Sequence, residues 1–265
     1  MNLERQAAVS GNSGAGSTVV RLHEFRGSCR ECGIRRHCLL DQMCDNGPSA
    51  PGVERCGGYL RRGEFVYHQG APFRSVYIVK SGCVMTYTTN TDGVEQVLGF
   101  HLPGEFFGLE GVHSGSYGSA AMALDQTHFC SFSMSQIEQL CSRNPAALHR
   151  LLGAFGSEMV KQNQAQVLRN QCETGQRLED FILDYSDRLQ RLGFAADDFK
   201  LSMSRYNIAS YLGSAPETVS RKFTELQRAG MLNVTGRRVH IVDRERWRQR
   251  AGGRAQSVRQ AAHLN

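Results

Sequence analysis

The sequence lacks long apolar stretches. Hydrophobic residues make up 40% of the 265 residues, yet no run reaches the roughly 18 apolar residues that a membrane-spanning helix requires. The opening segment, MNLERQAAVSGNSGAGSTVV, also contains no apolar core typical of a signal peptide. We therefore expect a cytoplasmic protein with no membrane partner.

The common catalytic patterns are missing as well. The sequence shows no Ser-His-acid arrangement, no glycine-rich phosphate loop and no H-E-x-x-H zinc motif. It also lacks the C-x3-C-x2-C spacing that is typical of radical iron–sulfur enzymes. These absences predict that the protein is not an enzyme.

Cysteine, by contrast, is plentiful, with nine residues. In a reducing cytoplasm a disulfide framework is not expected, so clustered thiols indicate metal ligands or redox centres. Cys29, Cys32 and Cys38 form a C-x2-C-x5-C cluster in SCRECGIRRHCLL. Four thiolates are the usual ligands of a 4Fe-4S cluster or of a structural zinc ion. Taken alone, the three thiols leave an iron–sulfur site, a zinc site and a thiol switch open.

Positive charge is concentrated near the C-terminus. Residues 199–254 contain 12 Lys and Arg against 4 Asp and Glu, whereas the whole chain carries a formal net charge of +6. This polarity favours contact between the C-terminal part and a polyanion such as a nucleic acid. A solvated, arginine-rich surface is the alternative interpretation.

Hydrophobic patterning divides the chain into six segments. We predict a flexible leader (1–20), a cysteine-rich segment (21–56), a β domain (57–143), a long helix (144–172), a helix-turn-helix domain (173–250) and a flexible tail (251–265). In the β domain, segments such as SVYIVKSG and VMTYTTN recur about every ten residues between glycine turns, which is typical of an antiparallel sandwich or barrel.

The long helix has an apolar seam. Asn144 is expected to cap it, and Pro145 suits its first turn. Apolar residues four, three and four positions apart form the seam, which a glutamine then continues: Leu148, Leu152, Phe155, Met159 and Gln162. We predict that two chains pair along this seam and that its polar second half pairs weakly. Packing of the helix on its own domain is the alternative.

Two short helices follow in SRYNIASYLGSAPETVSRKFTELQRAG, the first ended by Gly213 and the second begun at Pro216. Two helices joined by a tight glycine-containing turn form a helix-turn-helix. The next segment, LNVTGRRVHIV, alternates around Gly236 as a β-hairpin wing would. The region is therefore predicted to be a winged helix-turn-helix.

The second helix of such a motif lies in the DNA major groove. We predict that Glu217, Ser220 and Arg221 reach base edges, because Arg can donate two hydrogen bonds to guanine and Glu can accept one from cytosine. Val219, Phe223 and Leu226 should face inward. Residues expected to hold phosphates are Thr218, Lys222, Arg237 and Arg238.

These segments resemble the CRP/FNR family of transcription regulators. SRYNIASYLGSAPETVSRKFTELQRAGML is similar to its helix-turn-helix, and RSVYIVKSGCVMTYTTNTDGVEQVLGFHLPGEFFGLEGV is similar to its sensor domain. The E-x-x-S-R helix and the cysteine cluster together resemble the FNR branch, which carries an oxygen-labile 4Fe-4S cluster. The resemblance implies an α+β fold: an N-terminal antiparallel β-roll of the jelly-roll, cyclic-nucleotide-binding type, a dimerisation helix and a C-terminal winged helix-turn-helix.

The resemblance also implies ligands and partners. It gives the role of fourth cluster ligand to Cys130, whereas the residues alone do not separate Cys130 from Cys44 or Cys83. It implies a homodimer that binds a palindrome similar to TTGAT-N4-ATCAA in double-stranded DNA. RNA polymerase is a further implied partner, through surface loops such as TNTDGVEQ.

The sequence departs from the family pattern at two places. Gly118 and Ser119 stand where a nucleotide-binding relative has an Arg-Ser pair for the cyclic phosphate, so we do not expect a cyclic nucleotide to bind. The nearby Glu105 and Glu110 are then expected to be surface carboxylates. Gln162 stands where several FNR-like proteins carry an acidic residue whose repulsion keeps the cluster-free form apart. Either the polar half of the seam itself weakens pairing, or the cluster-free form of this chain remains a dimer.

Overall fold

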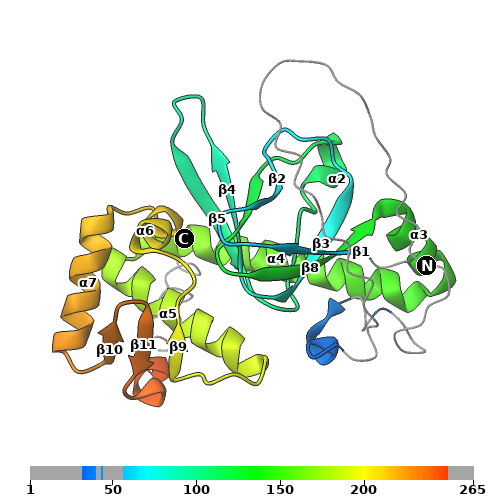
Figure 1. The fold of residues 1–265 in the computed structure, drawn as a ribbon. Coiled ribbons are helices and arrows are strands. Elements are labelled where there is room, and N and C mark those ends of the chain that lie inside the picture. The colour runs from blue at the N-terminus through cyan, green and yellow to red at the C-terminus, as the bar shows by residue number, and fades with distance from the viewer. Residues whose placement is uncertain (1–31, 40–42, 44–55, 250–265) are drawn as a thin grey trace, which may run out of the picture.

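The computed structural model describes residues 32–39, 43 and 56–249. The predicted leader and tail, together with Cys29 and Cys44, lie outside the described residues. Within them, a sensor domain and a C-terminal domain are joined by a long helix (Figure 1). No helix in the described part is both long and apolar enough to cross a membrane.

The sensor domain consists of two four-stranded antiparallel sheets with strand orders β1-β8-β3-β6 and β2-β7-β4-β5. The predicted sandwich of short strands is therefore confirmed. The strands are β1 (Cys56–Leu60), β2 (Phe65–Tyr67), β3 (Ser75–Ser81), β4 (Val84–Thr89), β5 (Glu95–His101), β6 (Phe106–Phe107), β7 (Ala120–Ala123) and β8 (Thr127–Ser133).

Short helical elements flank these sheets. They are η2 (Arg35–His37), in the cysteine-rich segment, α2 (Gly111–Ser114) and α3 (Met134–Arg143). Helix α3 was not predicted as a separate element. Its start is fixed by a capping box, in which the Ser133 hydroxyl and the Gln136 side chain bond to each other's backbone N–H groups.

The long helix α4 (Pro145–Gln171) has the predicted start. The side chain of Asn144 accepts a hydrogen bond from the backbone N–H of Ala146 at 2.9 Å, so Asn144 is the cap. The helix runs along the sensor domain and leads to the C-terminal domain (Figure 1). This course leaves part of its apolar seam on the molecular surface.

The C-terminal domain is a winged helix-turn-helix. Its elements are α5 (Thr174–Arg191), β9 (Asp198–Lys200), α6 (Arg205–Leu212), α7 (Pro216–Arg228), β10 (Leu232–Thr235) and β11 (Arg238–Ile241). Gly213 ends α6 in the left-handed conformation, as predicted. Strand β9 pairs with β11, so the wing sheet has three strands rather than the two expected.

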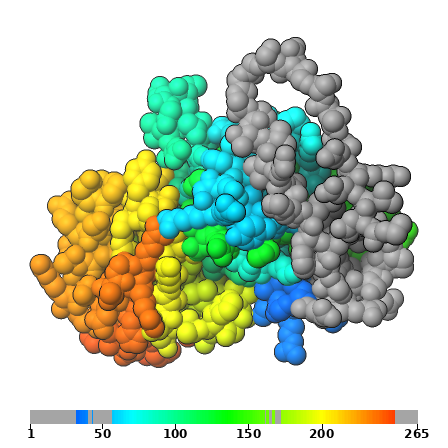
Figure 2. Space-filling view, in the orientation of Figure 1, coloured from blue at the N-terminus to red at the C-terminus, as the bar shows by residue number. Residues whose placement is uncertain are grey.

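The two domains pack against each other. One buried apolar cluster contains residues of both, and the Phe100 ring of β5 lies 5.8 Å from Phe181 of α5 and 5.4 Å from Tyr211 of α6, between ring centroids. The Ser210 hydroxyl of α6 accepts a bond from the backbone N–H of Val97 at 2.9 Å. Figure 2 shows the C-terminal domain, yellow to orange, against the sensor domain, while the β4–β5 hairpin projects beyond both.

Candidate nucleic-acid interface and cysteine site

Helix α7 has the predicted division into two faces. Val219, Phe223 and Leu226 are buried against the rest of the domain. Glu217, Ser220 and Arg221 are exposed on the opposite face. The helix therefore presents a cation, a carboxylate and a hydroxyl on one accessible surface, a set that can read base edges.

The predicted phosphate-binding residues already have partners within the chain. Lys222 Nζ lies 2.7 Å from Glu225 Oε2, and Arg237 donates to the Ser202 carbonyl at 3.1 Å. Arg238 makes two 2.7 Å hydrogen bonds to the carboxylate of Asp198. The bond from Arg238 lowers the pKa of Asp198. The Lys222 and Arg238 pairs are solvent-accessible, so DNA phosphates could compete for these two cations.

Arg205, at the start of α6, was missed by the sequence analysis. Its guanidinium lies 3.3 Å from the centre of the Phe223 ring, a cation–π contact between the two helices of the motif. Burial lowers the pKa of Arg205 to about 10, so the side chain remains charged at neutral pH. A cation–π contact between α6 and α7 leaves no periodic signal in the sequence.

The structure brings two of the predicted cluster ligands to one surface. Cys38 follows η2, Cys130 lies in β8, and both pack against an apolar cluster that includes Ile78 and Phe132. Cys32 precedes η2 and is partly exposed. The described residues contain no group of three side chains placed to bind a metal. The remaining predicted ligand, Cys29, lies outside them.

Cys83, one of the alternatives for the fourth ligand, is fully buried. Burial raises the pKa of its thiol to about 12. Because the thiolate is the form that ligates metals, this environment disfavours a ligand role for Cys83. Cys130, by comparison, is partly exposed.

The β-roll interior beside Ser119 is filled by side chains. The Tyr67 and Tyr117 rings stack 3.7 Å apart, and the Tyr117 hydroxyl donates to the Ser75 carbonyl at 2.8 Å. The Ser119 hydroxyl donates to Glu110 Oε1 at 2.6 Å. The carboxylate of Glu110 is thus hydrogen-bonded although the residue is exposed. That no cyclic nucleotide binds here stays a prediction.

Glu105 is not the surface carboxylate that was expected. It is bonded to Arg188 of α5, and the two side chains are 27% and 12% exposed. Burial disfavours the charged form of Glu105, but Arg188 and a backbone bond from Leu102 outweigh it and lower the pKa of this carboxyl. The expectation was wrong because the partner lies 83 residues away in the chain.

The apolar seam of α4 is largely uncovered in the single chain. Leu148, Leu152 and Met159 are 47%, 58% and 64% exposed. Phe155 differs, because it is half-buried with its ring 6.3 Å from that of Phe106. Gln162 is exposed. A second copy of the helix could therefore reach most of the predicted seam, while Phe155 also packs on its own domain.

Comparison with known proteins identifies both domains. Residues 58–144 match the cyclic nucleotide-binding domain, and residues 176–250 match the Crp-like helix-turn-helix domain. The chain is 35% identical over 216 residues to the transcriptional activator protein Anr of Pseudomonas aeruginosa, which covers 81% of this chain and 88% of that protein. It is 30% identical over 232 residues to the fumarate and nitrate reduction regulatory protein of Escherichia coli, with coverages of 84% and 90%.

The solved structures agree with this assignment. FixK2 from Bradyrhizobium japonicum aligns with a TM-score of 0.67 and 30% identity, covering 74% of this chain and 96% of that one. The named relatives are transcription regulators rather than enzymes. The fold, the helix-turn-helix and these similarities together show that the chain belongs to the CRP/FNR family of DNA-binding transcription regulators, in its FNR branch.

Proposed function

We propose that this protein is a cytoplasmic, oxygen-responsive transcription regulator. It holds a 4Fe-4S cluster through Cys29, Cys32, Cys38 and Cys130 and pairs through α4 when oxygen is low. The dimer then binds a palindrome similar to TTGAT-N4-ATCAA and acts with RNA polymerase on anaerobic genes. The observation that carries the proposal is that Cys38 and Cys130, although far apart in the chain, both pack against the same apolar cluster.

The donor set fits such a group. Four cysteine sulfurs are the usual ligands of a 4Fe-4S cluster, and the apolar neighbours of Cys38 and Cys130 limit contact with water. When bound, the cluster would supply the reactivity toward oxygen. Cys38 lies in the cysteine-rich segment and Cys130 lies in β8, so ligation of both would fix that segment against the sensor domain.

Dimer geometry links the seam to DNA. A two-fold dimer paired along α4 carries two α7 helices, which suit two half-sites about one DNA turn apart. The exposed apolar residues of the seam supply the surface for pairing. Without pairing, each chain loses the contribution of its partner to DNA affinity.

The cluster is tested by purification under anaerobic conditions, with an absorption spectrum and iron and sulfide assays. We expect a brown protein that bleaches in air and contains iron and acid-labile sulfide. Cys130→Ser should abolish loading, whereas Cys83→Ser and Cys44→Ser should load normally. A colourless protein that contains zinc, or normal loading of Cys130→Ser, would contradict the proposed ligand set.

The predicted base contact of Arg221 on α7 is tested by Arg221→Ala. Loss of a bidentate contact to guanine should weaken palindrome binding by about 1–3 kcal/mol and relax specificity at one base pair. Gln227→Ala, a change at an exposed position on the same helix, serves as the control. Specificity that is unchanged in Arg221→Ala would overturn the assigned role.

A further inference from the structure

The turn Leu102–Glu105 lies against the cysteine-rich segment. Gly104 has a φ of +88°, and a Cβ atom built on it would lie only 2.8 Å from the carbonyl oxygen of His37. His37 is the residue directly before Cys38. The backbone of the cysteine-rich segment therefore approaches this turn so closely that only glycine leaves room for it.

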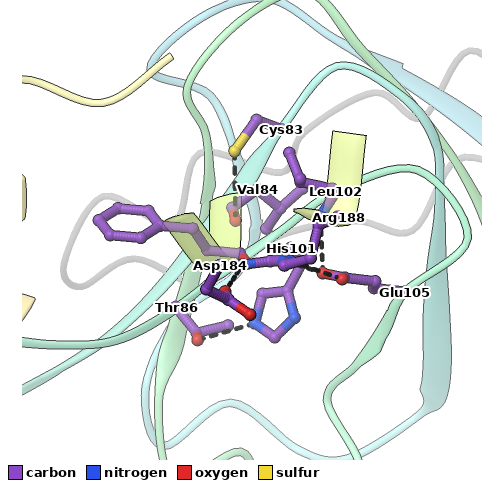
Figure 3. Close-up of polar contacts among 9 residues, drawn as sticks. Cys83, Val84, Thr86, His101, Leu102, Glu105, Asp184 and Arg188 are labelled. Atoms are coloured by element: carbon purple, nitrogen blue, oxygen red, sulfur yellow. Dashed lines mark hydrogen bonds and ion pairs between the residues drawn. The ribbon is translucent and has the colours of Figure 1, made fainter. Parts of the chain in front are cut away.

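The same turn holds the C-terminal domain. Arg188 Nε of α5 donates to Glu105 Oε1 at 2.8 Å, and Nη2 contacts both Glu105 Oε2 and the carbonyl of Phe100 (Figure 3). Glu105 Oε2 also accepts a bond from the backbone N–H of Leu102 at 2.9 Å, so the carboxylate is fixed to its own turn. A shift of the turn would therefore shift the anchor of α5.

This anchor is not easily exchanged for water. Both side chains are largely buried, so separating them would leave a charge without compensation in the domain interface. Asp184, on the same helix, has Oδ2 3.4 Å from Arg188 Nη1 and supports the cation. The contacts of Ser210 and Phe100 hold α6 on the neighbouring strand β5. The turn thus helps to set the orientation of the helix-turn-helix on the sensor domain.

We propose that the Leu102–Glu105 turn couples the cysteine-rich segment to the DNA-binding domain. Movement of the His37–Cys38 backbone shifts Gly104, and the adjoining Glu105 transmits the shift to Arg188 and α5. This inference rests on the proposed function, because it takes ligation of Cys38 as the event that positions the segment. It adds a route to DNA that does not pass through the dimer seam. Glu105 and Arg188 act in it as positioning residues.

The chain contains a matched control turn, Arg61–Glu64. Gly63 has a φ of +87°, but nothing lies within 4 Å of a Cβ atom built on it. Glu64 Oε2 accepts a bond from the backbone N–H of Arg61 at 2.7 Å, which is the counterpart of the Leu102–Glu105 bond. Gly63→Ala and Glu64→Gln therefore reproduce the local effects of Gly104→Ala and Glu105→Gln without the long-range contacts.

The experiment measures DNA affinity of the full-length protein with and without its cluster. The readout is the dissociation constant of the cluster-free protein for a palindromic duplex divided by that of the cluster-loaded protein. Iron content and gel filtration are recorded for each variant. Glu105→Gln and Gly104→Ala should lower this ratio by about tenfold, and the control variants should stay within about twofold of the parent. Glu105→Gln should load iron and dimerise normally, because Glu105 is neither a predicted cluster ligand nor a residue of the predicted seam. A parent-like ratio in Glu105→Gln would overturn the proposal.

Hydrogen exchange of the unmodified chain provides a second readout. Removal of iron should raise exchange in residues 102–105 and at the end of α5, relative to β10 and β11 of the wing. Unchanged protection of α5 would also overturn the coupling, even if Gly104→Ala fails to load iron. If the parent protein binds no iron, the proposed function fails. If every variant loads iron and keeps the ratio of the parent, only the coupling fails, so the two failures are distinguishable.

Discussion

Two turns of the β-roll share one local structure and differ in their surroundings. The sequences RRGEF at 61–65 and LPGEF at 102–106 each place a glycine of positive φ before a glutamate and then start a strand, β2 or β6. The N–H of Gly63 donates to the Ala123 carbonyl and that of Gly104 to the Val79 carbonyl, both at 2.8 Å. The backbone geometry of the two turns is thus nearly the same.

The tertiary contacts of the two turns differ. Glu64 is exposed, whereas Glu105 is bonded to Arg188 of the C-terminal domain. Gly63 faces open space, whereas Gly104 faces the backbone of His37. Local sequence determines the turn, because a glycine and a carboxylate suffice to build it. Elements distant in the chain determine whether the turn is a surface feature or a junction between three parts of the molecule.

The largest difference between the turns should appear when the cation is removed. Arg188→Ala leaves Glu105 without its counter-charge, which typically costs about 3–5 kcal/mol of stability for a buried pair. Arg61→Ala, at an exposed position of the other turn, should change stability by about 0.5 kcal/mol or less. Urea unfolding of the cluster-free proteins, followed by circular dichroism, measures both.

An apolar replacement of the pair provides the control for Arg188→Ala. Exchanging Glu105 and Arg188 together for Leu and Met should recover most of the lost stability, because no uncompensated charge remains. Equal stability losses in Arg188→Ala and Arg61→Ala would show that the two turns are energetically equivalent.

The next largest difference should come from the glycines. An alanine at either position suffers a strain of about 1–2 kcal/mol from the positive φ. Gly104→Ala should lose about 1–3 kcal/mol more than Gly63→Ala, because its Cβ atom would collide with the His37 carbonyl. The difference in unfolding free energy between the two variants therefore isolates the contact with the cysteine-rich segment. A difference near zero would mean that His37 does not press on Gly104 in solution.

Much of the fold could be predicted from the sequence, because its signals are local. Glycine turns marked the β-roll, Asn144 and Pro145 marked the start of α4, and Gly213 marked the end of α6. Amphipathic spacing also separated the buried and exposed faces of α7. These features depend on backbone conformation and on side chains a few residues apart.

The remaining features depend on contacts between distant segments. Glu105 was expected to be a surface carboxylate, as Glu64 is, because nothing in the GEF pattern distinguishes the two residues. Strand β9 was missed because its pairing with β11 joins Asp198 to His240. The role of Cys130 came from the family resemblance alone, and only the folded chain shows that Cys130 and Cys38 pack against the same apolar cluster.

The smallest expected difference between the turns is in their response to acid. Burial raises the pKa of the Glu105 carboxyl, but the positive charge of Arg188, with a smaller contribution from His101 of β5, keeps it below the ordinary value of 4.5. Asp184 is the second carboxylate beside Arg188. A lowered pKa in the folded state means that the stabilisation is present above pH 4.5 and is lost as the pH falls through the lower, folded-state value. The stability gap between the parent and Glu105→Gln should therefore narrow as cluster-free protein is unfolded in urea at decreasing pH, and Glu64→Gln should keep the acid dependence of the parent. A gap that stays constant with pH would show that Glu105 gains nothing from its charge, and the two turns would then differ in packing alone.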